Sequence, residues 1–350
     1  MKVLLTLNID AFRFSVMQAL RETSIRIPDI DFYTFSNPLT EEDRRLGRRF
    51  WSYPNIHQTT IAQALSMRFD VVHQGHFTTR SLGGALLARV RSLGRCKHLV
   101  RANIEPFRED PCFWHYALSI RAADKLVAVS RAVADGVRRT FRRNVDAVIP
   151  NGVNVEFFSP EQARPVDLEK LGISRPFAVF TGSLERRKRP DVLLELSRLI
   201  PELNFVMLGT YVHASERDHY LRLIRECPNV RYLGLQPCEL LRDLYAQAVA
   251  LVFPSDLEGM PQAVLEAQAM GLPVLAQPAS SLPECVEEDI TGWLIPASPV
   301  AGWAERLRRV LAWSDAERNT YAARSRQATI TRHSWDVVAP RYREVYLGCR

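Results

Sequence analysis

Two glutamates with seven residues between them, Glu258 and Glu266, flank the predicted start of a helix. Pro261 is typical of a first helical position, so the amides around Gly259 and Met260 are free donors at the positive end of a helix dipole. Such a terminus binds phosphate. Glu266 lies more than one turn inside the helix, where its carboxylate can accept hydrogen bonds from vicinal hydroxyls, and Glu258 lies on the loop before it. A phosphate site with an acid on either side predicts a sugar nucleotide as ligand.

Apolar segments on both sides place this helix in an alternation of strands and helices. Val249 to Phe253 is predicted as a buried strand, Pro261 to Met270 as the helix, and Gly271 as its cap before Pro273 to Leu275 re-enters the sheet. Similar segments predict further strands at Val3–Leu7, Asp31–Phe35, Phe69–His73, Phe177–Gly182, Asn204–Gly209 and Asn229–Gly234. A last helix is predicted from Trp335 to Leu347. The fold class is therefore α/β.

Length and composition indicate two well-packed domains. The chain has 350 residues, of which 47% are hydrophobic, and this is enough for two cores. Its six cysteines show no metal-binding spacing, which predicts reduced thiols, no disulfide and a cytoplasmic protein. Residues 1–9 are apolar but too few for a signal peptide or a membrane span, so they are predicted as a strand.

The formal net charge of +7 belongs to the first half of the chain. Residues 1–160 hold 23 Lys and Arg against 15 Asp and Glu, whereas residues 161–350 hold 23 against 24. No recognition motif accompanies the charge, so nucleic acid is not expected as a partner.

A basic and aromatic segment, residues 41–53, suits an anionic membrane surface. Its arginines can lie among lipid headgroups while its aromatic rings enter the interface; these residues are Arg44, Arg45, Arg48, Arg49, Phe50, Trp51 and Tyr53. The alternative is a solvated loop helix. Arg80 to Lys97 continues the basic character, with apolar residues at helical spacing at Leu82, Leu86, Val90 and Leu93. We therefore expect a cytoplasmic protein that is peripheral on the inner face of the cell membrane.

A longer run surrounds the two glutamates and reads E-G-M-P-x-x-x-L-E-A-x-A-x-G-L-P-V from Glu258 to Val274. It closely resembles the signature of the family 4 glycosyltransferases, which are retaining enzymes of the GT-B fold. Further segments resemble the same family at Ala122–Ser130, Val148–Asn154, Ser280–Glu284 and Thr291–Leu294. The resemblance implies two Rossmann-like domains facing across a cleft. Residues 1–160 would bind the acceptor, residues 161–334 would bind the donor, and a helix in 335–350 would cross back to the first domain.

The resemblance also implies a reaction. A nucleotide sugar would give its sugar, with retention, to a hydroxyl of a glycan or lipid-linked acceptor in cell-surface polysaccharide or glycolipid synthesis. Glu258 would orient the sugar and Glu266 would bind the ribose or its equivalent, while Lys188 and the amides near Gly259 would stabilise the departing diphosphate. We expect no cofactor and no metal, because this fixed positive charge makes a cation redundant. The D-x-D pattern at residues 29–31 is interpreted as structural.

The predicted donor loop departs from the family pattern. Relatives have Gly-Arg-Leu followed by Lys-Gly, and this chain has Gly-Ser-Leu from Gly182 and then Lys188-Arg189. Lys188 keeps its place, but Ser183 replaces an arginine that binds the diphosphate. The missing charge could come from Arg186, Arg187 or Arg189. Gly234, at the end of a later strand, precedes a loop that often contacts the base in relatives.

The acceptor side is predicted from the first domain. The loop after the first strand begins at Asn8 and lacks the glycines that relatives often have. His73 and His76 could each contact an acceptor, or His73 could cap a strand. Asn103 stands where many relatives have a histidine close to the transferred sugar, and an amide cannot exchange a proton as imidazole does. Ser183 and Asn103 together leave a second function open, a non-catalytic GT-B protein that binds a nucleotide sugar or a partner enzyme.

Overall fold

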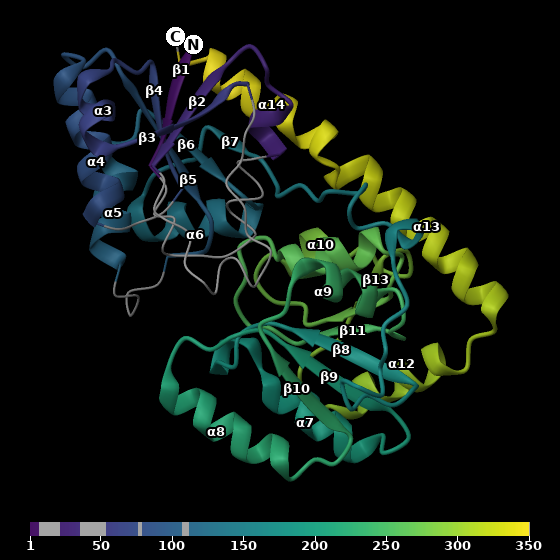
Figure 1. The fold of residues 1–350 in the computed structure, drawn as a ribbon. Coiled ribbons are helices and arrows are strands. Elements are labelled where there is room, and N and C mark those ends of the chain that lie inside the picture. Colours follow the sequence, from purple (N-terminus) through teal and green to yellow (C-terminus); the bar gives the residue numbers. More distant parts are fainter. Residues whose placement is uncertain (7–21, 36–53, 76–78, 107–111, 350) are drawn as a thin grey trace. The chain divides into compact units, whose positions relative to one another are not determined.

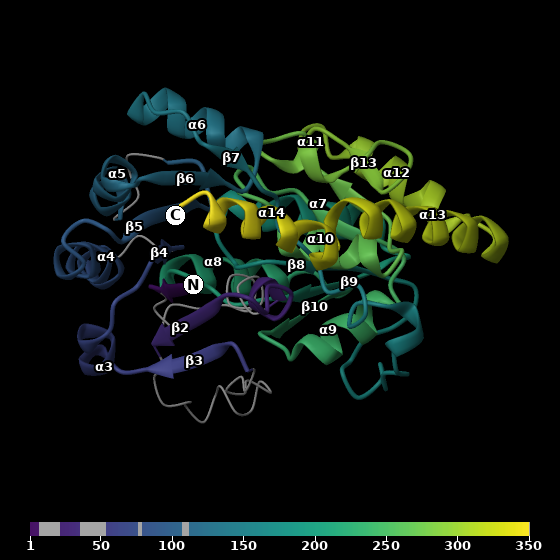
Figure 2. The same cartoon turned by 90° about the horizontal axis from the view of Figure 1, so that it is seen from above.

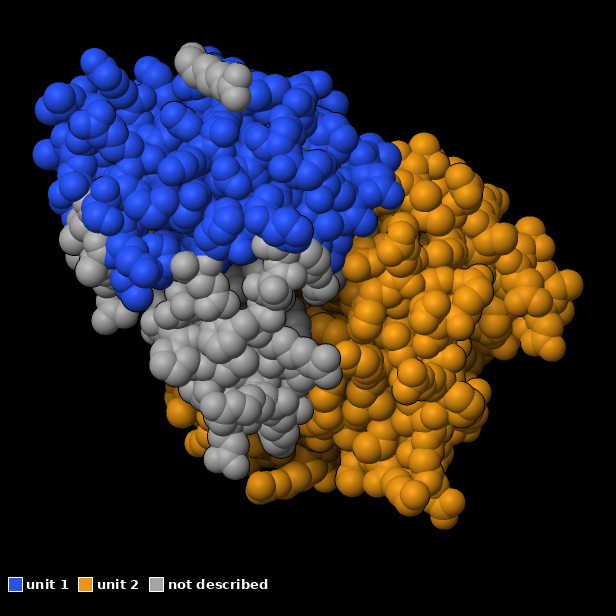
Figure 3. Space-filling model, turned by 45° about the horizontal axis from the view of Figure 1, so that its top comes forward, with its two compact units in different colours: residues 1–152, 335–350 blue, residues 153–334 orange. Residues whose placement is uncertain are grey.

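The computed structural model describes residues 1–6, 22–35, 54–75, 79–106 and 112–349. Its chain forms two compact units, residues 1–152 with 335–350 and residues 153–334 (Figure 3). No helix in these described ranges is long and apolar enough to cross a membrane.

The first unit is built on a parallel sheet of seven strands among the described residues, in the order β3-β2-β1-β4-β5-β6-β7. The strands are β1 (Lys2–Leu5), β2 (Asp31–Phe35), β3 (Ile56–Thr59), β4 (Val71–Gln74), β5 (Lys97–Ala102), β6 (Lys125–Ala128) and β7 (Ala147–Val148). The helices are α3 (Ile61–Ser66), α4 (Thr79–Arg91), α5 (Phe113–Ala122), α6 (Arg131–Phe141) and α14 (Trp335–Leu347). Strand β3 did not follow from the sequence, because Ile56–Thr59 lacks a continuous apolar run.

Alternate residues of β1 and β4 point to opposite faces of this sheet, as the pleat requires. Val3 and Val71 pack under α14 with its buried Trp335 and Tyr346. On the other face, Leu4 belongs to a second cluster of buried residues with Val72, Ala64 of α3 and Ala85 of α4. The last helix thus belongs to the first unit, and it spans the predicted residues.

The second unit is built on a parallel sheet of six strands in the described chain, in the order β10-β9-β8-β11-β12-β13. The strands are β8 (Phe177–Thr181), β9 (Asn204–Leu208), β10 (Val230–Gly234), β11 (Leu251–Phe253), β12 (Val274–Ala276) and β13 (Gly292–Leu294). The helices are α7 (Pro190–Leu199), α8 (Ala214–Arg225), α9 (Cys238–Tyr245), α10 (Gln262–Ala269), α11 (Leu282–Cys285), α12 (Ala301–Leu311) and α13 (Asp315–His333). Helices α7, α8 and α12 cover one face, and α9, α10 and α13 lie on the other (Figure 1).

The second unit begins earlier than the predicted residue 161. Val153 donates a backbone hydrogen bond to His333 at the end of α13 (2.7 Å). Arg326 of α13 donates to the carbonyls of Val155 (2.9 Å) and Phe158 (2.8 Å), and the Phe158 ring is fully buried. Residues 153–160 therefore pack on α13, which the sequence patterns did not predict.

Candidate functional site

The structure brings Lys188 and Glu258 together. Lys188 ends the 3₁₀ turn Arg186–Lys188 after β8, and Glu258 lies on the loop between β11 and α10. The ammonium donates a hydrogen bond to the carboxylate of Glu258 and lies 5.4 Å from the centre of the Phe253 ring. Only 13% of the Lys188 side chain and 9% of the Glu258 side chain are exposed. A desolvated, hydrogen-bonded ion pair of this kind fixes both side chains.

Hydrogen bonds to backbone carbonyls fix the two loops relative to each other. The carbonyl of Arg187 accepts from the amide of Asp256 (2.8 Å) and from the hydroxyl of Ser255 (3.2 Å). The hydroxyl of Ser280 donates to the carbonyl of Glu258 (2.7 Å). The position of Glu258 is therefore set from both sides.

Ser183, which stands where relatives have arginine, takes part in a small charged cluster. Its hydroxyl donates to the buried carboxylate of Glu185. The guanidinium of Arg187 donates to the same carboxylate (2.8 Å) and to the carbonyl of Leu257 (3.0 Å), next to Glu258. Arg187 is thus the cation that lies beside the Lys188–Glu258 pair.

The helix after Glu258 starts one residue later than predicted. Pro261 has an extended ψ of 117° and is the N-cap, so α10 begins at Gln262 rather than at the proline. The amide of the buried Gly259 has no acceptor among the described residues, so it remains a donor at this terminus. Met260 is buried, with its sulfur 3.1 Å from that of Cys285.

Gly271 ends α10 as predicted. Its φ of +72° is in the left-handed region. The amides of Gly271 and Leu272 donate to the carbonyls of Gln268 and Ala267 (both 2.9 Å), the paired bonds of a Schellman motif. A Cβ at position 271 would lie 2.7 Å from that of Ala322 in α13, so both conformation and space require glycine.

Glu266 is a buried residue of α10. No described side chain donates a hydrogen bond or ion pair to it, and burial raises the pKa of its carboxyl to about 8. Burial, and next the charge of Glu266, raise the pKa of the nearby Tyr245, whose hydroxyl donates to Thr181 (3.0 Å). A buried carboxyl group without protein partners is suited to accept hydrogen bonds from a ligand.

Glycines line the carboxyl ends of three adjacent strands. Gly182 follows β8, Gly209 follows β9, and Gly234 ends β10. A Cβ at Gly209 would lie 2.0 Å from the carbonyl oxygen of Gly182, so these backbones approach too closely for a side chain. The amide of Gly209 donates to the carbonyl of Gly234 (2.9 Å), and nothing lies within 4 Å of the position of a Cβ at Gly234. The space at the carboxyl end of β10 is therefore open, as a ligand site at strand ends requires.

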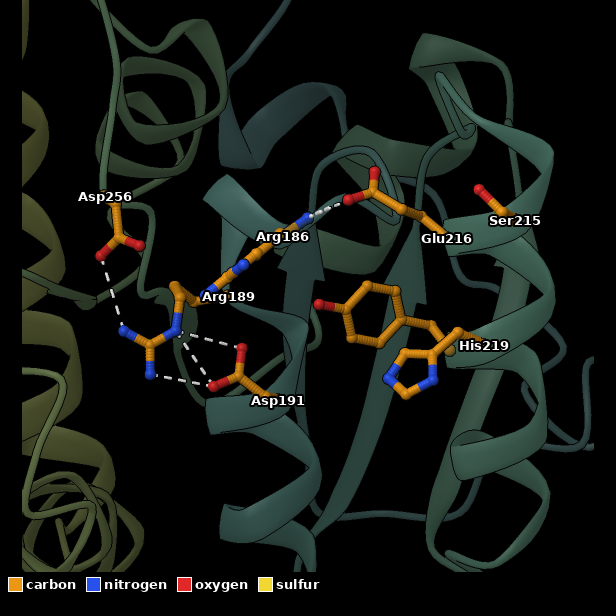
Figure 4. A pocket seen from close by; sticks show the side chains of 8 residues that line it. Arg186, Arg189, Asp191, Ser215, Glu216, His219 and Asp256 are labelled. Carbon is orange, nitrogen blue, oxygen red and sulfur yellow. Dashed lines mark hydrogen bonds and ion pairs between the residues drawn. The ribbon is translucent and has the colours of Figure 1, made fainter.

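A cavity of about 550 Å³ lies beside the donor loop (Figure 4). Arg189 forms ion pairs with Asp191 (2.9 Å) and Asp256 (3.5 Å), and Glu216 accepts from the amide of Arg186 (3.3 Å). Its lining is Arg186, Arg189, Asp191, Ser215, Glu216, His219, Tyr220 and Asp256. Because Lys188, Glu258 and Glu266 are not among these residues, the cavity adjoins the predicted phosphate site and does not contain it.

His73 does not face an acceptor. Its ring is buried under α14, where Nδ1 lies 2.7 Å from the hydroxyl of Tyr346 and the ring stacks on Tyr342. Burial, and next the charges of Arg101 and His98, lower the pKa of His73 to about 3. The predicted contact of His73 with an acceptor is therefore wrong. His73 is the third residue of the buried strand β4, and its side chain points toward α14.

Asn103, which was predicted as a catalytic residue, is half-buried and directly follows β5. Its amide donates to the carbonyl of Gly75, which follows β4. Asn8 and His76 lie outside the described residues, as does the basic and aromatic segment 41–53.

Both acids of the D-x-D pattern have side-chain partners within the first unit. Arg343 of α14 pairs with Asp29 (2.7 Å), and His57 lies 3.2 Å from Asp31. Within the described ranges, no group of three or more His, Cys, Asp or Glu side chains could hold a metal ion.

Three residues of the site were not predicted: Glu185, Tyr245 and Ser280. Glu185 follows Ser183 by two residues, a spacing without a signature. Tyr245 belongs to α9, and it lies near Glu266 only because α9 packs against α10. Ser280 is in a segment that resembles the family, but only the structure shows its bond to Glu258.

Solved structures of the GT-B fold resemble the whole chain. HepE from Anabaena in complex with UDP and glucose covers 99% of this chain and is itself covered completely, with a TM-score of 0.80 and 16% identity. Sucrose-phosphate synthase from Thermosynechococcus elongatus covers 99%, with 98% of its own chain matched, a TM-score of 0.78 and 17% identity. The protein therefore has the GT-B fold, with two Rossmann-like α/β domains.

Sequence comparison gives the family. The model described as Glycosyltransferase Family 4 matches residues 18–157, and that of Glycosyl transferases group 1 matches residues 164–328. A D-inositol 3-phosphate glycosyltransferase from Xylanimonas cellulosilytica is 33% identical over 244 residues, 65% of this chain and 57% of that protein. One from Corynebacterium diphtheriae is 27% identical over 275 residues, 72% of this chain and 64% of that protein. The match thus spans about three fifths of these curated relatives. The chain belongs to the family 4 glycosyltransferases.

Proposed function

We propose that this protein is a retaining glycosyltransferase that moves a sugar from a nucleotide sugar to a hydroxyl. The Lys188–Glu258 pair carries the proposal, because it lies beside the free amide of Gly259 and one helix turn before the buried Glu266. A diphosphate bound there would meet one ammonium and a helix terminus, while Glu266 would accept from the ribose hydroxyls. HepE, which shares the fold, binds UDP and glucose and supports a nucleotide sugar as the donor.

The acceptor is proposed to be a hydroxyl of a glycan or of a lipid-linked molecule, in cell-surface polysaccharide or glycolipid synthesis. A peripheral position on the inner face of the membrane would bring the protein to such acceptors. The names of the curated relatives add a small polyol phosphate, D-inositol 3-phosphate, as the first acceptor to test in solution.

A thermal-shift panel of UDP-, GDP-, ADP- and CMP-linked sugars tests the donor, because a ligand that binds only the folded state stabilises it. One nucleotide class should raise the melting temperature, and Glu266→Ala should abolish that rise. Turnover of the selected donor with D-inositol 3-phosphate or a lipid-linked acceptor then tests catalysis, and the anomeric configuration of the product tests retention.

Binding of a donor without turnover on any acceptor would favour the second function, a non-catalytic protein that binds a nucleotide sugar. Ser183 and Asn103 are the observations that keep it open, since neither side chain carries the charge or the proton of its counterpart in relatives. Absence of any thermal shift would contradict both of these functions and would leave the other form of the second one, a non-catalytic GT-B protein that binds a partner enzyme.

A further inference from the structure

The outer faces of α4 and α5 expose large apolar side chains. On α5, 74% of Trp114 and 55% of Leu118 are exposed. At the end of α4, 72% of Val90 and 87% of Leu93 are exposed. Single exposed apolar residues are ordinary, but a group of them on neighbouring helices marks an interaction surface.

Leu93 is held in an unfavourable conformation as well. Its φ of +54° is left-handed, which costs a branched side chain energy that glycine or asparagine would largely avoid. The amide of Gly94 donates to the carbonyl of Arg89 (2.9 Å), so this turn ends α4. Since 87% of this side chain is exposed, burial does little to offset the cost.

The sequence pattern of α4 makes the exposure more unusual. Leu82, Leu86, Val90 and Leu93 recur at the spacing that normally marks the buried face of a helix. Leu82 is buried, yet Leu86 is exposed together with the two residues that follow it in this pattern. The helix thus has an apolar stripe that continues from the core onto the surface.

Helices α4 and α5 lie side by side (Figure 2). Arg89 of α4 donates to the carbonyl of Ala122 at the end of α5 (2.7 Å) and pairs with Asp124 (3.2 Å). We call the exposed apolar side chains of these neighbouring helices the α4–α5 surface; they are Leu86, Val90, Leu93, Trp114 and Leu118.

Exposed arginines lie on the same two helices and in the turn after α4. Residues 71–104 contain six Lys and Arg and no Asp or Glu. Arg91, Arg95 and Arg121 are exposed, and within the described part of the chain none of their guanidinium groups is paired with an acid. Arg89, by contrast, is paired.

We propose that the α4–α5 surface is a membrane-binding surface that inserts its apolar side chains into the interface of an anionic bilayer. The apolar residues would enter the boundary between headgroups and acyl chains, and the three arginines would remain with the anionic headgroups. An apolar surface flanked by exposed arginines fits such a bilayer better than a protein partner, whose interface would have to supply several acids. The surface belongs to the first unit and the proposed donor site to the second, so membrane binding would not require a bound donor.

Vesicle co-sedimentation of the whole chain tests the proposal. The wild type should sediment with phosphatidylcholine vesicles that contain phosphatidylglycerol, and less with phosphatidylcholine alone or at high salt. The variant Val90→Gln, Leu93→Gly, Trp114→Gln should bind at least about tenfold more weakly, as should Arg91→Gln with Arg95→Gln. Leu93→Gly relieves the left-handed strain, so the first variant is chosen to keep its fold.

Matched controls remove exposed apolar residues elsewhere, Val337→Gln on α14 and Leu199→Gln on α7, and should leave vesicle binding unchanged. A donor thermal shift on every variant separates loss of membrane binding from loss of the proposed function. The proposal is overturned if the wild type does not bind, if the apolar variant binds like the wild type, or if only the arginine variant is impaired. A concentration-dependent dimer that the apolar variant abolishes would assign the surface to a second copy and would also overturn it.

Discussion

Lys188 donates its hydrogen bond to Glu258 across 70 residues of sequence, and the pair is mostly buried. Lys188 lies in a short turn after β8, and Glu258 lies in a loop before α10. The carbonyl of Arg187 joins the two segments by accepting hydrogen bonds from Asp256 and Ser255. Because the charges of the pair cancel each other, Lys188 alone cannot neutralise a diphosphate. The binding of a donor must therefore either loosen this pair or use a second cation.

The first prediction concerns the stability that depends on this pair. Lys188→Met should lower the free energy of unfolding by about 3–5 kcal/mol, because it leaves the Glu258 carboxylate buried and unpaired. The double variant with Glu258→Gln should recover most of that loss, yet donor binding and turnover should stay impaired. Urea unfolding and single-turnover kinetics measure the two effects. Equal stability of the wild type and Lys188→Met would show that the ion pair is not formed in solution.

Lys188 and Glu258 could be predicted from the sequence, because each stands in a segment with its own signature. The strand Asp31–Phe35 was also predicted with its observed bounds, and Phe177–Thr181 and Asn204–Leu208 were predicted one residue too long, because buried parallel strands are apolar runs between turn residues.

What the sequence could not predict depends on contacts between distant segments. The direction of the His73 ring follows from α14, which lies more than two hundred residues later in the chain. The packing of residues 153–160 on α13 follows from Arg326, an exposed-type residue that is half-buried here. Local patterns contain no information about either partner.

Arg187 is predicted to be the second cation of the donor site. Its guanidinium lies between Glu185 and the carbonyl of Leu257, whereas Arg189 is already paired with two acids. Arg187→Ala should weaken donor binding by about 1.5–3 kcal/mol, the usual cost of losing a charged hydrogen bond. Adding Ser183→Arg to that variant should restore binding, because it returns a guanidinium to the same cluster. Arg198→Ala, on the exposed part of α7, is the matched control and should bind the donor normally. If Arg187→Ala binds the donor like the wild type, the second cation lies elsewhere.

Glu266 should make stability depend on pH between about 4.5 and 8. In that window the folded protein keeps a proton that the unfolded chain has lost, so stability falls as pH rises, by up to about 1.4 kcal/mol per pH unit. Glu266→Gln, which cannot ionise, should therefore gain stability over the wild type as pH rises through this range and no further above it. Urea unfolding at several pH values measures the difference. A difference that does not change with pH would contradict the raised pKa.

The same residue should bind donor hydroxyls. Glu266→Ala should weaken donor binding by about 1.5–3 kcal/mol. Gln268→Ala, which removes a neighbouring buried amide bonded to Cys285 and Thr291, controls for general damage to α10. Unchanged donor affinity in a folded Glu266→Ala protein would remove Glu266 from the site.

His73 should destabilise the protein in acid. Its pKa is lowered from 6.5 to about 3, so below pH 6.5 the unfolded chain binds a proton that the folded protein excludes. Stability should be lost as pH falls from 6.5 toward 3, by up to about 1.4 kcal/mol per unit. His73→Gln keeps a hydrogen-bonding group for Tyr346 without the titration, so its stability should fall less steeply than that of the wild type. Parallel pH profiles would show that His73 remains neutral in both states or is charged in both.

Catalysis is predicted to need no divalent metal. A diphosphate needs its charge neutralised, and Lys188, Arg187 and the amide of Gly259 provide fixed positive groups at one place, so a cation would be redundant there. Turnover should persist in excess EDTA and should fall when the fixed charge is removed in Lys188→Ala. Asp29→Asn, which changes the D-x-D pattern, should remove its ion pair with Arg343 and leave turnover unchanged. If EDTA abolishes turnover and manganese restores it, the diphosphate is bound through a metal, and the role given to the helix terminus is wrong.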